Sequence, residues 1–137
     1  MRPIAVLGAG SWGTALAIHL GRIGHSVRLW SRAPALAETM RSKRFNLNYL
    51  PDIKLPPTVE PTSLLTSAIE NVDFVVVAVP SHGVRSVIAE VVSLIDHSTM
   101  VVSATKGLER GTLLRMFEVI IQELGNRQPV AVLSGPS

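Results

Sequence analysis

The sequence has 137 residues, of which 47% are apolar and 17% are charged, which excludes a disordered chain and favours one domain with a buried core. Its net charge of +3 comes from basic residues scattered along the chain, so we expect no nucleic-acid partner. The longest apolar run, from Phe74 to Val79, is too short for membrane insertion. The absence of cysteine excludes disulfides and suits the cytoplasm, the location that we expect.

In chain order, short apolar segments alternate with amphipathic segments, which predicts that strands alternate with helices. Strands are predicted at residues 4–7, 26–30, 73–79, 100–103 and 130–133. Helices are predicted at residues 11–23, 35–44, 64–69, 82–95 and 112–124. Four prolines exclude a continuous helix or a central strand from residues 46–61, which we interpret as a long functional loop. This order predicts an α/β fold with a doubly wound, mostly parallel sheet.

Gly8, Gly10 and Gly13 follow the first predicted strand with the spacing G-x-G-x-x-G, which is typical of Rossmann-type dinucleotide-binding domains. The first glycine allows a tight turn, the second lets a pyrophosphate approach the backbone, and the third lets the helix pack closely. The N-terminus of the next helix then binds phosphate, and Ser11 adds a hydroxyl donor. The alternative is a glycine-rich turn without a ligand. Trp12 either flanks the cofactor or is a partly buried aromatic residue.

The second predicted strand ends in Trp30-Ser31-Arg32 and carries no acidic residue there. An acid about 20 residues after the glycine loop ordinarily binds the ribose 2′-hydroxyl of NAD. A guanidinium instead matches a 2′-phosphate, because it donates several charge-assisted hydrogen bonds. We therefore predict that NADPH is preferred and that NADH is the second cofactor. The alternative for Arg32 is a solvated surface side chain.

Five short segments spread over the whole chain are more specific together than the glycine spacing alone. They are residues 8–17, 48–51 (Asn-Tyr-Leu-Pro), 79–82 (Val-Pro-Ser-His), 104–109 (Ala-Thr-Lys-Gly-Leu-Glu) and 134–137 (Ser-Gly-Pro-Ser). In this order and spacing they resemble the NAD(P)-dependent glycerol-3-phosphate dehydrogenase family of bacteria. That family interconverts dihydroxyacetone phosphate and sn-glycerol 3-phosphate for glycerophospholipid synthesis. The resemblance therefore implies an oxidoreductase with a phosphorylated small-molecule substrate.

The resemblance also assigns roles to individual residues. It implies contacts to the cofactor from Ser11, Trp12, Arg32, Tyr49 and Lys106. It implies that Lys106 lies where cofactor and substrate meet, and that Gly135 and Ser137 help to hold the substrate. Lys106 also follows a predicted strand at the carboxyl edge of the sheet, where open α/β folds bind ligands. The alternatives are a surface lysine and, for residues 135–137, an ordinary turn.

The same resemblance implies that residues 1–137 form an incomplete Rossmann domain, because the sequence stops inside a motif at Ser137. In the family, a helical domain follows and supplies the lysine that transfers the proton. We therefore expect no catalytic residue in this chain and no turnover by the isolated fragment. A homodimer is an expectation for the full-length enzyme. No pair of histidines has metal-ligand spacing, so we expect no metal.

Two other functions stay open on the sequence. One is a Rossmann dehydrogenase that acts on a sugar acid or on ketopantoate, although the segments 104–109 and 134–137 favour glycerol 3-phosphate. The other is a domain that senses the nicotinamide redox state without catalysis. A substrate screen distinguishes the first alternative, and the reading frame beyond Ser137 distinguishes the second.

Overall fold

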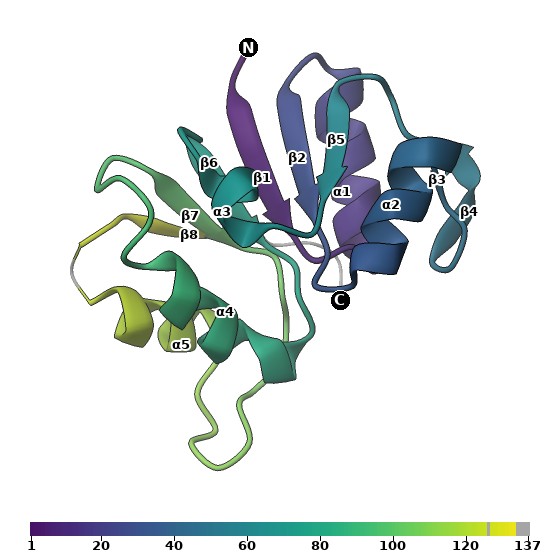
Figure 1. Ribbon diagram of the computed structural model, residues 1–137. Helices are drawn as coiled ribbons and strands as arrows, with labels where there is room; N and C mark the ends of the chain where they lie inside the picture. Colours follow the sequence, from purple (N-terminus) through teal and green to yellow (C-terminus); the bar gives the residue numbers. More distant parts are fainter. Residues whose placement is uncertain (126, 134–137) are drawn as a thin grey trace.

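A six-stranded sheet forms the centre of the computed structural model, which describes residues 1–125 and 127–133 (Figure 1). Its strands are β1 (Pro3–Leu7), β2 (Ser26–Trp30), β5 (Val59–Thr62), β6 (Phe74–Val77), β7 (Met100–Ser103) and β8 (Val130–Val132). Their order is β5-β2-β1-β6-β7-β8, and every pair of neighbours is parallel. Strands β2 and β5 follow on one side of β1, whereas β6, β7 and β8 follow on its other side. This order confirms the predicted doubly wound α/β class.

Helices cover both faces of the sheet (Figure 1). One face carries α1 (Ser11–Arg22) and α2 (Pro34–Lys43), whereas the other carries α3 (Leu65–Ile69), α4 (Val84–Val91) and α5 (Met116–Leu124), with a 3-10 turn, η1 (Ser81–Gly83), before α4. Each face of the sheet has its own cluster of buried apolar side chains. In β1, Ile4 and Val6 belong to the cluster beneath α1 and α2, whereas Ala5 and Leu7 belong to the cluster beneath α3, α4 and α5. A parallel strand buried on both faces must be apolar throughout, as this one is. Among the described helices, none has the length and apolar character needed to cross a membrane.

Residues 46–61 do not form the continuous loop that their prolines suggested. Three strands interrupt this stretch, namely β3 (Phe45–Asn46), β4 (Leu50–Lys54) and β5, and β3 and β4 pair with each other in antiparallel orientation. β5 lies at the edge of the main sheet and pairs only with β2. An edge strand tolerates Pro61 because it needs hydrogen bonds on one side only. The exclusion of a continuous helix and of a central strand is confirmed, but the interpretation as one long loop was wrong, because proline does not exclude edge strands.

The last predicted helix also begins later than expected, at Met116. Leu113 has a φ of 60° and is 70% exposed, so it does not belong to the apolar stripe of the helix. Its N–H donates to the Glu109 carbonyl at 2.9 Å and closes a turn. The Glu118 carboxylate accepts a hydrogen bond from the Arg115 N–H at 2.9 Å and caps the first turn. The cap therefore sets the start of α5, which apolar spacing alone does not reveal.

Two adjacent isoleucines test how α5 packs. Ile120 is fully buried, whereas Ile121 is 41% exposed. We expect Ile120→Ala to lower the free energy of unfolding by about 2–5 kcal/mol, because it opens a cavity in the core. The matched control, Ile121→Ala, should lower it by less than about 1 kcal/mol. Urea unfolding followed by circular dichroism measures both, and equal losses would contradict this packing.

Candidate functional site

The turn between β1 and α1 packs so closely that glycine is required at two positions. A Cβ atom on Gly8, whose φ is 118°, would lie 2.7 Å from the backbone of Ala78 and Val79. A Cβ atom on Gly13 would lie 1.8 Å from the Gly8 carbonyl oxygen. At Gly10, in contrast, an added Cβ would meet none of the described atoms within 4 Å. The first and third glycines therefore serve packing, and the second faces the open space that a ligand needs.

The N-terminus of α1 follows this turn and is suited to an anion. Within the described residues, no side chain caps Gly10 and no acidic residue lies in the first turn of the helix. The first intrahelical bond runs from the Thr14 N–H to the Gly10 carbonyl at 3.0 Å. The N–H groups before Thr14 have no partner within an ideal helix, and the positive end of the helix dipole adds to their attraction for phosphate.

Asn46 ties the glycine turn to the β3–β4 hairpin and was missed in the sequence. Its side chain is fully buried, and its Nδ2 donates to the Ala9 carbonyl and to the Thr14 hydroxyl, both at 2.8 Å. Its Oδ1 accepts a hydrogen bond from the Tyr49 N–H at 3.2 Å, and the Ser11 hydroxyl donates to the Tyr49 carbonyl at 2.9 Å. Asn46 therefore positions both the glycine turn and Tyr49. A polar residue in a segment interpreted as a loop gives no sign that it will be buried.

A groove of about 690 Å³ extends from the glycine turn to the end of β2. Seven of the predicted cofactor residues line it: Gly8, Gly10, Ser11, Trp12, Gly13, Arg32 and Tyr49. The opposite wall comes from the segment between β6 and α4, which includes His82. The groove therefore lies at the carboxyl ends of the parallel strands, where doubly wound sheets bind their ligands.

Arg32 lies at the rim of this groove and already contacts an acid. Its Nη2 is 2.9 Å from the Glu90 carboxylate, and its guanidinium carbon is 5.1 Å from the centroid of the Trp30 ring. The side chains of Arg32 and Glu90 are 63% and 51% exposed, so this ion pair is weak. A guanidinium has five N–H donors. Arg32 can therefore bind a further anion while Glu90 keeps one of them.

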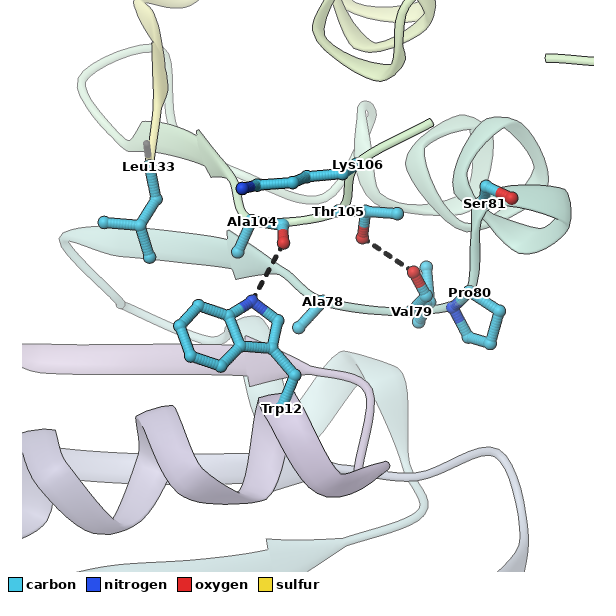
Figure 2. Close-up of a pocket in the computed structure, with 9 residues that line it drawn as sticks. All are labelled: Trp12, Ala78, Val79, Pro80, Ser81, Ala104, Thr105, Lys106 and Leu133. Carbon is cyan, nitrogen blue, oxygen red and sulfur yellow. Dashed lines mark hydrogen bonds between the residues drawn. The ribbon is translucent and has the colours of Figure 1, made fainter. Parts of the chain in front are cut away.

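A second pocket, of about 540 Å³, adjoins the groove and contains Lys106 (Figure 2). The Trp12 ring lies on its floor, and its Nε1 donates to the Ala104 carbonyl at 2.9 Å. The Thr105 hydroxyl donates to the Val79 carbonyl at 2.6 Å and joins the ends of two neighbouring strands. The Lys106 side chain extends above Ala104 (Figure 2). Trp12 lines both cavities, so the pocket and the groove are adjacent at this residue.

The structure thus brings those predicted site residues that it describes into one region. Gly135 and Ser137, the two substrate positions predicted near the end of the sequence, lie outside the described residues. Lys106, predicted for cofactor and substrate alike, lines the second pocket. In the described part of the chain, no three His, Asp or Glu side chains are grouped as metal ligands.

Comparison with known proteins points to one family. Residues 3–137 match the family described as NAD-dependent glycerol-3-phosphate dehydrogenase N-terminus. The chain is 45% identical over 135 residues to glycerol-3-phosphate dehydrogenase (NAD(P)+) of Thioalkalivibrio sulfidiphilus, and 48% identical over 134 residues to that of a Thermoanaerobacter species. Each match covers 98% of this chain and 40% of the relative. The chain therefore spans about 40% of the length of these curated relatives.

The fold gives the same result. The crystal structure of glycerol-3-phosphate dehydrogenase from Coxiella burnetii matches with a TM-score of 0.92 and 43% identity, over 99% of this chain and 41% of that chain. A prephenate dehydrogenase from A. aeolicus matches with a TM-score of 0.65 over 93% of this chain and 40% of that chain, but at 14% identity it shows the fold alone. These relatives favour neither the sugar-acid or ketopantoate dehydrogenase nor the redox sensor. The chain belongs to the NAD-dependent glycerol-3-phosphate dehydrogenase family, of which it matches the N-terminal part.

Proposed function

We propose that this chain is the cofactor-binding part of an enzyme that transfers a hydride between NAD(P)H and dihydroxyacetone phosphate or sn-glycerol 3-phosphate. One observation carries the proposal: the glycine groove and the Lys106 pocket share Trp12, Ala78, Val79 and Pro80. A ligand that occupies the groove and extends past these shared residues would therefore reach the pocket. The family relationship supplies the substrate, since the relatives named above are glycerol-3-phosphate dehydrogenases.

Each part of the site has a chemical task in this proposal. The glycine turn and the N-terminus of α1 would hold the pyrophosphate, and Trp12 and Ala78 would hold the nicotinamide end. When it is bound, the cofactor supplies the hydride. The Lys106 ammonium would attract the substrate phosphate or polarise its carbonyl oxygen, because Lys106 lines the pocket next to the groove. The Trp12 ring, held by Ala104, would limit access of water.

We propose further that NADPH is preferred and that NADH is accepted. Arg32 lies at the rim of the groove and supports this preference, since the 2′-phosphate distinguishes the two cofactors. Glu90 opposes it, because its carboxylate competes for the same guanidinium. The expected preference is therefore moderate.

The remaining proposals rest on likeness to the family. They are a cytoplasmic enzyme that feeds glycerophospholipid synthesis, a proton-transferring lysine in the part of the relatives that this chain does not cover, and a homodimer of the complete protein. The homodimer is tested by light scattering of the complete gene product, and a monomeric mass would refute it.

The first prediction for this site concerns the choice of cofactor. Arg32→Gln should weaken NADPH binding about tenfold, because a hydrogen bond to a charged group contributes about 1.5 kcal/mol at the low end of its range. NADH binding should hardly change. The matched control, Arg22→Gln, removes an exposed arginine at the end of α1 that lies outside the groove. Titration calorimetry at one salt concentration measures the dissociation constants of each variant for NADPH and for NADH. Equal weakening of NADPH and NADH would contradict the role of Arg32.

The second prediction concerns Lys106 in the complete gene product. Lys106→Gln should lower kcat/KM for dihydroxyacetone phosphate by about a hundredfold, since it removes a charge aimed at the reacting molecule. Lys54→Gln is the matched control, because Lys54 is exposed on β4 and lines neither cavity. Steady-state assays with NADPH and NADH measure the effect. The absence of turnover in the unchanged protein with either cofactor would refute the proposed function.

A further inference from the structure

The connection between β7 and α5, residues 104–115, is here called the Lys106 loop. Leu108 and Arg115 form an antiparallel bridge within it, and the Glu109 N–H donates to the Leu114 carbonyl at 2.8 Å. The loop projects beyond α4 and α5 (Figure 1). Leu108 and Leu113 are 55% and 70% exposed. Burial of these two side chains therefore cannot be what holds the loop against the rest of the domain.

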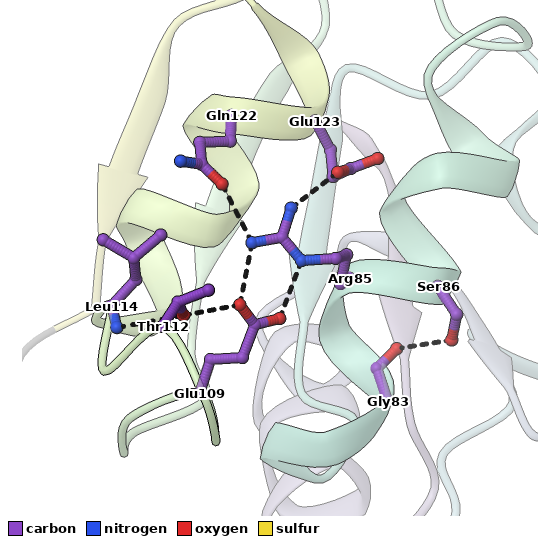
Figure 3. A network of polar contacts seen from close by, with 8 residues as sticks. All are labelled: Gly83, Arg85, Ser86, Glu109, Thr112, Leu114, Gln122 and Glu123. Carbon is purple, nitrogen blue, oxygen red and sulfur yellow. Dashed lines mark hydrogen bonds and ion pairs between the residues drawn. The ribbon is translucent and has the colours of Figure 1, made fainter.

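Arg85 supplies polar contacts that hold it (Figure 3). From α4, its Nε and Nη2 donate to the two carboxylate oxygens of Glu109 at 2.7 and 2.8 Å. Its Nη1 donates to Glu123 at 2.7 Å, and its Nη2 also donates to Gln122 at 2.9 Å, both on α5. The Thr112 hydroxyl donates to Glu109 at 2.7 Å. One guanidinium therefore joins α4, the Lys106 loop and α5, and its bond to the loop is bidentate.

Lys106 lies between two anchors. On one side, the Thr105 hydroxyl donates to the Val79 carbonyl at 2.6 Å. On the other side, Glu109 is bound by Arg85. Val79 and Arg85 both belong to the segment from β6 through α4 that also forms a wall of the cofactor groove. The backbone of Lys106 is therefore fixed, from both directions, to the part of the domain that faces the cofactor site.

Electrostatics strengthens the second anchor. The hydrogen bonds from Arg85, followed by that from Thr112, lower the pKa of Glu109 from 4.5 to about 2. Hydrogen bonds to Glu109 and Glu123 raise the pKa of Arg85. The contact is therefore fully ionised at neutral pH. Loss of the Arg85 charge would leave two carboxylates of like charge facing one site, which favours displacement of the loop.

We propose that Arg85 is a positioning residue that acts through Glu109 to hold Lys106 against the substrate, an inference that rests on the proposed function. A purely structural alternative is that Arg85 only joins α4 to α5. The two carboxylates separate these roles, since Glu109 belongs to the loop and Glu123 belongs to α5.

Kinetics of the complete gene product provides the first test. Glu109→Gln should raise the KM for dihydroxyacetone phosphate by about tenfold, because small displacements of a positioned group are costly to catalysis. Its affinity for NADPH should stay unchanged. Glu123→Gln, the matched control, should leave both values unchanged. Arg85→Lys keeps the charge but loses the bidentate geometry, so it should raise the KM in the same direction even if Glu109→Gln folds poorly. An unchanged KM in the folded variants would overturn the proposal.

A double-mutant cycle with Lys106 tests whether the effect passes through that residue. In a Lys106→Gln background, Glu109→Gln should cause no further loss in kcat/KM, whereas fully additive losses would overturn the proposal. Amide hydrogen exchange gives a readout that does not need activity. Exchange at residues 105–109 should become faster in Glu109→Gln and stay unchanged in Glu123→Gln; equal effects would overturn the positioning role. If exchange responds as expected and no dehydrogenase activity is found, the proposed function fails and the anchoring of the loop stands.

Discussion

The close approach of the β1–α1 turn to the end of β6 is the constraint on which the whole site depends. Gly8 leaves no room for a side chain, because a Cβ atom there would lie 2.7 Å from the backbone of Ala78 and Val79. Backbone hydrogen bonds to the neighbouring strands also hold the turn. The Gly8 N–H donates to the Trp30 carbonyl at 2.9 Å, and the Ala78 N–H donates to the Leu7 carbonyl at 2.8 Å. As a result, α1 begins at the point where the order of strands reverses and presents its positive end to the crevice.

The segment from β6 through α4 forms part of the wall of both cavities. Ala78, Val79 and Pro80 line the groove and the Lys106 pocket alike. In the same segment, the Val79 carbonyl accepts a hydrogen bond from the Thr105 hydroxyl, and Arg85 binds Glu109. The segment therefore also fixes the loop that carries Lys106. The relative placement of the glycine turn and the lysine therefore depends on one stretch of backbone, an arrangement that keeps a site rigid.

The features that could be predicted from the sequence are those with a local cause. Gly8 and Gly13 follow from the steric demands of a strand-turn-helix unit, and the alternation of strands and helices predicted the parallel sheet. The errors had two different causes. Pro61 lies in a strand because that strand is at the edge of the sheet, a fact that no local pattern contains. The start of α5 at Met116 depends on the Glu118 cap, which is a local contact but is not part of the apolar spacing from which the helix was predicted.

By itself, the sequence determined the fold class, the glycine turn, and the placement of Arg32 and Lys106 at the ends of strands. Only the tertiary structure decided what these side chains meet. Arg32 contacts Glu90 across 58 positions of sequence, Asn46 contacts Ala9 across 37, and Arg85 contacts Glu109 across 24. The physical reason is that local backbone preferences act over a few residues, whereas the partners of a polar side chain are chosen by packing of elements far apart in the chain.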